Sequence, residues 1–369
     1  MKLLSLKIVL LMALLPVIIL GQISKSSFYR SADIKSGFSY QSWSTENDQT
    51  ISEMVIPLNL IVPVSKSISF TASTNSAFAD LNTASTKLNG LTDTRISGSF
   101  ITMEDKLLIT AGVFLPTGKT KLEKDQASVA SALALYPLNF RVPSFGQGLM
   151  ANLNAVMAFE TKDFIIGGGL GFVYKNGFKP YENFDAVYKP GMEFSINAGG
   201  ESNWSRKFKL TLDVTYTLYG KDTYDETEVF KSGNKLIADI RALFKFRGLD
   251  LLVFARERTK GRNDRGLGNL STEEKNSNGN QIDFGSMAYI PLSKSVNWKL
   301  LADFKYYSKN EYENNGAKIF GGGTGFNFKL SDNFSFDIMG KYSTGTLDNQ
   351  STSLGITGIE FGGNIVITL

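Results

Sequence analysis

The chain contains 369 residues with a formal net charge of +4 at pH 7, and it is rich in glycine (35) and poor in proline (9). It has neither cysteine nor histidine, which excludes disulfides, thiolate metal sites and hydrolytic triads that use histidine as the general base. The near-neutral charge gives no support for nucleic-acid binding. We therefore expect a protein that is not an enzyme and has no catalytic, cofactor-binding or metal site.

The N-terminus predicts export. Lys2 and Lys7 precede an apolar run at 8–20 that ends beside Gly21. This arrangement is typical of a secretory signal peptide, here residues 1–21. Residues 22–33 would then form a short periplasmic leader, and residues 34–369 a single domain, since no linker divides them.

The segment Arg206–Tyr219 shows the pattern on which the fold prediction rests. Apolar residues from Phe208 to Leu218 alternate strictly with polar ones from Lys207 to Thr217. This period of two indicates an extended strand with one apolar and one polar face. Because the pattern recurs behind an export signal, we predict an all-β transmembrane antiparallel up-and-down β-barrel, with lipid outside and a polar lumen inside.

We expect about sixteen strands, or fourteen if the first strand and one neighbour are miscounted. The predicted ranges are 34–43, 50–62, 67–78, 92–102, 106–115, 148–159, 163–174, 191–201, 206–219, 234–246, 249–259, 280–291, 296–307, 317–330, 333–343 and 354–369. Their connections alternate between short turns and long polar loops, among them 79–91, 116–147, 175–190, 220–233, 260–279 and 344–353. This asymmetry predicts short periplasmic turns and long extracellular loops.

Aromatic residues near the ends of these strands predict interfacial girdles, although ordinary strand aromatics would look the same. They are Trp43, Tyr174, Trp204, Trp298, Tyr306 and Tyr342.

The lumen side differs between the two halves of the chain. In the first half it is mostly small or neutral, whereas in the second half it carries charges of both signs. We predict a basic wall formed by Lys207, Lys209, Arg241, Lys245, Arg256 and Arg258. Two interpretations stay open: the wall sets a transverse field that favours anionic or amphipathic solutes, or its charges pair across strands and hold the wall rigid.

The longest loop, 116–147, contains an alanine-rich segment at 122–135 that predicts a short helix. The loop either folds into the mouth of the barrel or caps it externally. If it narrows the mouth, we expect an apolar constriction lined by Leu133, Leu135, Tyr136, Phe140 and Phe145.

Two glycine runs, G-G-G-L-G at 167–171 and G-G-G-T-G at 321–325, do not fit a dinucleotide-binding fingerprint and do not open helices. Inside strands, glycine permits bends and close packing.

The segment from Gly112 to Lys119, the sequence F-G-Q-G at 145–148 and the glycine-rich hairpin that ends at Tyr174 resemble a known family. They are similar to bacterial outer-membrane transporter barrels of the phenol-degradation meta-pathway type, and more distantly to FadL-type carriers of hydrophobic compounds. The resemblance implies passive uptake of small, often hydrophobic or aromatic, molecules. The chain departs from FadL-type carriers because it has no N-terminal hatch segment of useful length.

Two functions remain open from the sequence. The first is a channel or facilitator in the outer membrane of a Gram-negative bacterium, in contact with membrane lipid and a small-molecule solute. The second is a structural or interaction barrel whose loops bind a partner protein or a polysaccharide. The oligomeric state and the solute are not specified by the sequence.

Overall fold

The computed structural model describes residues 31–183 and 185–369. The predicted signal peptide and most of the predicted leader lie outside the described residues. No helix in the described part of the chain is long and apolar enough to cross a membrane.

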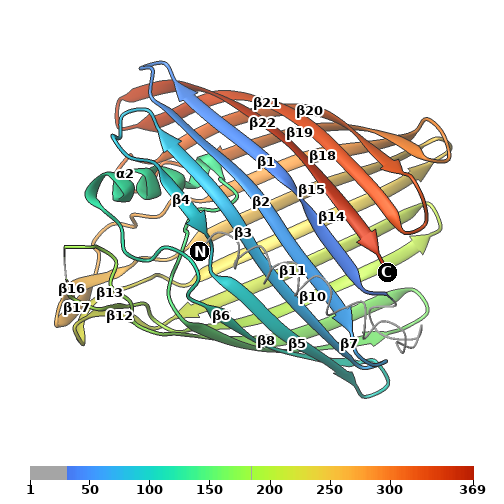
Figure 1. Ribbon diagram of the computed structural model, residues 1–369, viewed down its shortest axis with the longest axis horizontal. Coiled ribbons are helices and arrows are strands. Elements are labelled where there is room, and N and C mark those ends of the chain that lie inside the picture. The colour runs from blue at the N-terminus through green and yellow to red at the C-terminus, as the bar shows by residue number, and fades with distance from the viewer. Residues whose placement is uncertain (1–30, 184) are drawn as a thin grey trace, which may run out of the picture.

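The wall is a single antiparallel sheet that closes on itself (Figure 1). Closure is made by the first and last strands, which pair from Asp33 with Thr368 to Thr45 with Ile356. The strands of the first half are β1 (Asp33–Thr45), β2 (Thr50–Pro63), β3 (Ile68–Leu81), β4 (Leu88–Leu91), β5 (Thr94–Thr102), β6 (Leu107–Leu115), β7 (Met150–Glu160) and β8 (Phe164–Lys175). Those of the second half are β10 (Glu193–Ser205), β11 (Phe208–Tyr219), β14 (Lys235–Phe246), β15 (Leu249–Lys260), β18 (Gln281–Pro291), β19 (Val296–Tyr307), β20 (Gly316–Lys329), β21 (Phe334–Asn349) and β22 (Thr352–Thr368).

These strands occupy sixteen positions around the barrel, because β4 and β5 share one. β4 pairs with the C-terminal part of β3 at Ser76–Ala79, and β5 pairs with the N-terminal part of β3 at Ile68–Ser73. The prediction of a sixteen-strand barrel is therefore confirmed.

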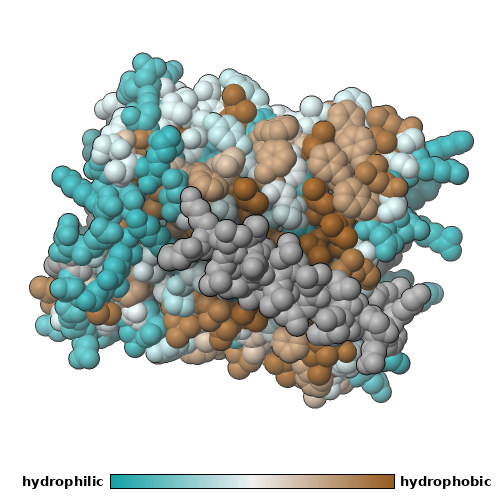
Figure 2. Space-filling view, viewed as in Figure 1, coloured by the Kyte–Doolittle hydropathy of each residue, from teal (hydrophilic) through white to brown (hydrophobic). Residues whose placement is uncertain are grey.

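Short turns lie at one end of the barrel and long loops at the other (Figure 1), the arrangement expected for the periplasmic and extracellular sides. Figure 2 shows apolar side chains across the middle of this face and hydrophilic residues at both ends. Such an apolar band is the surface that a bilayer requires.

Two regions of ordered loop structure lie at the extracellular end. The loop after β6 contains α2 (Lys124–Leu133), in the segment where the sequence predicted a helix, and a 3-10 turn at Tyr136–Leu138. Three other loops, predicted without secondary structure, together form a five-stranded sheet. Its strands are β9 (Tyr188–Lys189), β12 (Lys221–Tyr224), β13 (Thr227–Lys231), β16 (Asp264–Leu267) and β17 (Asn269–Thr272).

Candidate functional site

The strand register places the predicted lumen residues on one continuous face. Asp213 lies opposite Asp239, which in turn lies opposite Arg256. The other face carries exposed apolar side chains, such as Leu212 (50% exposed) and Ile359 (56% exposed). The alternation read from the sequence is thus the division between lumen and lipid.

The long loop leaves the wall and returns to it at a narrow neck held by Asp93. One carboxylate oxygen of Asp93 accepts a hydrogen bond from the backbone N–H of Gly118 at 3.0 Å, and the other accepts one from the N–H of Gln147 at 2.7 Å. A Cβ on Gly118 would lie 2.0 Å from the carbonyl oxygen of Phe145. The two ends of the loop therefore meet closely, and only glycine fits at this contact.

Further into the loop, Glu53 and Gln41 hold it against the inner face of the wall. The Glu53 carboxylate, on β2, accepts hydrogen bonds from the backbone N–H groups of Arg141 and Val142 at 3.0 and 3.2 Å. Gln41, its cross-strand neighbour on β1, donates from Nε2 to the carbonyl oxygen of Leu138 at 2.7 Å. Glu53 is 1% exposed, and the loop supplies the backbone donors that its buried carboxylate requires.

An apolar cluster fills the space between the loop and this wall. The wall contributes Trp43, Ile51, Val55, Ala77, Ala79, Leu88, Ile319 and Ile356, and the loop contributes Val129, Leu133, Leu138, Phe140, Val142 and Phe145. The loop therefore packs inside the barrel mouth. The expectation that Trp43 belongs to an interfacial girdle is wrong: its side chain is 2% exposed and lies in this cluster.

The five residues expected at the constriction divide into two groups. Leu133, Phe140 and Phe145 are between 1% and 5% exposed and belong to the buried cluster. Leu135 and Tyr136 are 48% and 52% exposed and face a cavity of about 1030 Å³ at the extracellular mouth. We call this cavity the vestibule. The loop thus presents two of the five side chains to a solute and uses the other three for packing.

The vestibule lies between the loop and wall strands that include β15 and β19, and the β1–β2 hairpin closes part of its rim. The guanidinium carbon of Arg258, on β15, is 3.3 Å from the centroid of the Tyr136 ring, a cation–π contact. On β19, the Tyr307 hydroxyl donates to the carbonyl oxygen of Tyr136 at 3.3 Å. The tip of the loop therefore contacts β15 and β19, while its base is held on β1 and β2.

Three of the six residues of the predicted basic wall are paired with carboxylates on neighbouring strands. Its ion pairs join Lys209 to Glu201 at 2.6 Å, Arg241 to Asp213 at 2.5 Å and Arg256 to Asp239 at 2.8 Å. Lys207 and Lys245 line a hollow of about 470 Å³ near the periplasmic end. The six residues thus share one lumen face without forming one continuous positive surface.

Further round the wall, beyond β18, ion pairs span β20. Lys341 on β21 pairs with Asp303 on β19 at 3.0 Å and with Glu360 at 3.6 Å. Lys299 on β19 pairs with Asp337 on β21. Each of these β19–β21 pairs passes over β20, which has glycine at its lumen positions 321, 323 and 325.

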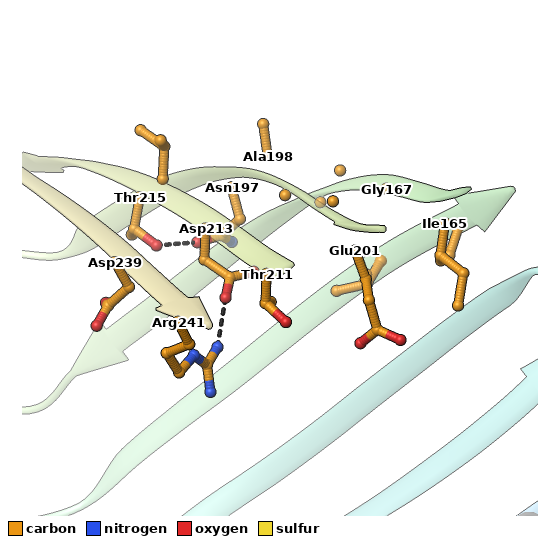
Figure 3. A pocket seen from close by; sticks show the side chains of 17 residues that line it. Ile165, Gly167, Asn197, Ala198, Glu201, Thr211, Asp213, Thr215, Asp239 and Arg241 are labelled. Atoms are coloured by element: carbon orange, nitrogen blue, oxygen red, sulfur yellow. Dashed lines mark hydrogen bonds and ion pairs between the residues drawn. The ribbon is translucent and has the colours of Figure 1, made fainter. Parts of the chain in front are cut away.

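The other glycine-rich strand, β8, leaves a trough in the wall (Figure 3). The trough has a volume of about 580 Å³, and its lining includes Gly167, Gly169 and Gly199. Polar side chains border it, including Thr215, whose hydroxyl donates to Asn197 Oδ1 at 2.8 Å. In this part of the lumen, the surface of the trough is therefore formed by glycine backbone and bordered by polar side chains.

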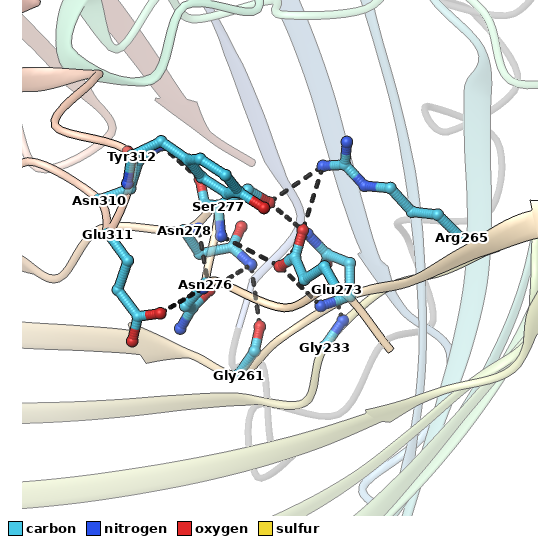
Figure 4. Close-up of polar contacts among 11 residues, drawn as sticks. Gly233, Gly261, Arg265, Glu273, Asn276, Ser277, Asn278, Asn310, Glu311 and Tyr312 are labelled. Atoms are coloured by element: carbon cyan, nitrogen blue, oxygen red, sulfur yellow. Dashed lines mark hydrogen bonds and ion pairs between the residues drawn. The ribbon is translucent and has the colours of Figure 1, made fainter. Parts of the chain in front are cut away.

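Outside the barrel mouth, Glu273 organises a loop beside the second sheet (Figure 4). It accepts hydrogen bonds from the backbone N–H groups of Asn263 at 2.9 Å and Ser277 at 3.0 Å, and Arg265 lies 3.4 Å away. Burial alone would raise the pKa of Glu273, but these donors and the cation together hold it below its usual value. These contacts hold the loop in one conformation.

No protein-family model matches the chain, and no curated protein is significantly similar to it. Among solved structures, it is similar to the TodX deltaS2S3 mutant monoaromatic hydrocarbon channel, with a TM-score of 0.50 and 7% identity over 92% of this chain and 91% of the other. It is also similar to CdiB from Acinetobacter baumannii, with a TM-score of 0.51 and 11% identity over 90% of this chain and 60% of the other. At these identities the likeness concerns the fold alone, a transmembrane β-barrel.

Proposed function

We propose that the protein is a passive channel in the outer membrane of a Gram-negative bacterium, exported by cleavage of its signal peptide. Its solutes are small molecules with a hydrophobic or aromatic part, and it performs no catalysis. The observation that carries the proposal is the loop fixed inside the mouth, which leaves a vestibule of about 1030 Å³ beside Leu135 and Tyr136. A hydrocarbon channel of similar fold supports this solute class.

The charged lumen residues act unequally in this proposal. Lys209, Arg241 and Arg256 hold the wall rigid through their ion pairs. Arg258 contacts the loop at Tyr136, while Lys207 and Lys245 line the hollow near the periplasmic end. Selectivity then depends mainly on the mouth.

The proposal is tested by single-channel conductance in planar bilayers, with the full-length protein and a variant that lacks residues 119–141. We expect stable conductance that rises at least about twofold on deletion, because a sixteen-strand barrel is wide when nothing fills it. Deleting residues 265–271, which form most of the β16–β17 hairpin outside the mouth, is the control and should leave conductance unchanged. Folding of each variant is checked by heat-modifiable mobility on gels.

Equal conductance with and without the loop would show that the loop is not the constriction. If neither folded protein conducts ions, the result would instead favour a second candidate function. In that function the protein is a structural barrel that binds a partner protein or a polysaccharide. The ordered second sheet is the observation that favours this candidate, since its Leu267 is 81% exposed. An exposed apolar side chain on a fixed hairpin is a feature of binding surfaces.

A further inference from the structure

Three cations lie together in the vestibule, and no carboxylate among the described residues forms an ion pair with them. Lys235 on β14 lies directly opposite Lys260 on β15, and Arg258 follows two residues before Lys260 on the same face of β15. All three are half-buried and line the vestibule. In the described part of the chain, none of them forms an ion pair, in contrast to Lys209, Arg241 and Arg256 further down the same wall.

This arrangement costs stability in the empty protein. Like charges directly opposite each other on neighbouring strands repel, and partial burial strengthens the repulsion. The carboxylates of the same cavity, Glu46 and Asp348, belong to the β1–β2 hairpin and to β21. Asp348 accepts a hydrogen bond from the Ser353 hydroxyl at 2.7 Å. Asp222 and Glu273 lie near Lys260, and Asp283 lies near Arg258, and they offset part of this repulsion. None of them forms an ion pair with the three cations, so an external anion can relieve the rest.

Aromatic and apolar side chains lie beside the three cations in a cavity whose lining is otherwise largely polar. The Lys235 ammonium lies 5.7 Å from the centroid of the Tyr219 ring, and Arg258 lies over Tyr136. Leu135, which is 48% exposed, faces the same cavity. A bound anion would therefore have apolar surface beside its charged group.

We propose that Lys235, Arg258 and Lys260 form a binding site for a small organic anion with an apolar body, such as an aromatic carboxylate. The carboxylate would lie between the two lysines and Arg258, and the ring would lie against Leu135 and Tyr136. The inference deepens the proposed function, because the site's part in uptake depends on the barrel being a channel.

The test is calorimetric titration of the folded full-length barrel in detergent with three probes. Sodium benzoate carries both charge and ring, benzamide has the ring without the charge, and inorganic phosphate has charge without an apolar body. We expect saturable benzoate binding, with benzamide and phosphate each about tenfold weaker or more, as the loss of a charge-assisted hydrogen bond or of buried apolar surface implies.

Variants locate the site. Lys235→Gln and Lys260→Gln should each weaken benzoate binding about tenfold, and neither should impair folding because each removes a repulsion. Lys245→Gln is the matched control: it removes the same charge from the same face of β14, at the periplasmic end, and should leave benzoate affinity unchanged.

Equal binding of benzoate and benzamide, equal binding of benzoate and phosphate, or an equal loss in Lys245→Gln would each overturn the proposal, as would the absence of saturable benzoate binding. The readout does not require permeation. A closed barrel can still bind benzoate, and a conducting barrel can fail to bind it, so failure of the site and failure of the channel are distinguishable.

Discussion

Two strands of the wall, β8 and β20, carry almost the same glycine-rich sequence but face the lumen differently. On both, alternate glycines point inward. Across β20, the neighbouring strands contribute Asp303 and Lys341, whose charges meet over the glycines. Across β8, the neighbours contribute short neutral side chains such as Asn154 and Asn197, and a trough of about 580 Å³ remains.

The difference teaches that a glycine run in a barrel strand creates space, and that the adjacent strands determine its use. On β20 the space lets long side chains pair across two strands, and the pair of Asp303 and Lys341 is only 10% exposed. On β8 the space stays open to solutes. The following predictions test this comparison.

The largest expected effect is that of Lys341→Met. It removes the cation that forms ion pairs with Asp303 and Glu360, and breaking a buried pair from one side costs about 3 kcal/mol of unfolding free energy. Urea unfolding in detergent, followed by tryptophan fluorescence, measures the change. If unfolding free energy fell by less than about 1 kcal/mol, water would already screen the Lys341–Asp303 pair, as it screens the exposed Arg241–Asp213 pair beside the trough.

A smaller loss is expected for Gly321→Ala. The added Cβ would lie 2.2 Å from Asp303 Oδ1 and 2.4 Å from Lys341 Cε, so the pair must shift at a cost of about 1–2 kcal/mol. Gly322→Ala is the matched control, because a Cβ there has nothing within 4 Å. The same unfolding assay applies, and equal losses for both variants would assign the effect to backbone strain.

The smallest effect should be that of Arg241→Gln beside the trough. Arg241 and Asp213 are 52% and 45% exposed, and exposed pairs contribute below about 1 kcal/mol. A double-mutant cycle with Asp213→Asn, measured at low and high salt, should give a coupling energy that falls with salt. A coupling as large as that of the β20 pair would remove the distinction between the two regions.

Most strand positions could be predicted because alternation is a local signal. The range 296–307 is also that of β19 (Val296–Tyr307). The predicted strands are too short where the real strands project beyond the apolar band. For example, β21 was expected to end at 343 and continues to Asn349. There both faces of a strand meet water or loops, so its residues no longer alternate.

The mouth was harder to predict, since its contacts join residues far apart in the sequence. Glu53 lies 88 and 89 residues from its donors Arg141 and Val142. The only local signal for the anchoring role of Glu53 was that it is a single carboxylate among neutral lumen positions of β2. Likewise, nothing local distinguishes Leu133, which is buried, from Leu135, which faces the vestibule.

By itself, the sequence determined the barrel and the division between lipid and lumen, because a period of two fixes which side chains share a face. It predicted about sixteen strands and left fourteen open, and the structure decided for sixteen. Only the tertiary structure decided which lumen charges are paired, that the loop lies inside the mouth, and that Lys235, Arg258 and Lys260 lie together without an ion pair to any described residue. Those features depend on the register between strands and on where the loop packs. Both are set by contacts between distant segments, which periodicity along the chain does not encode.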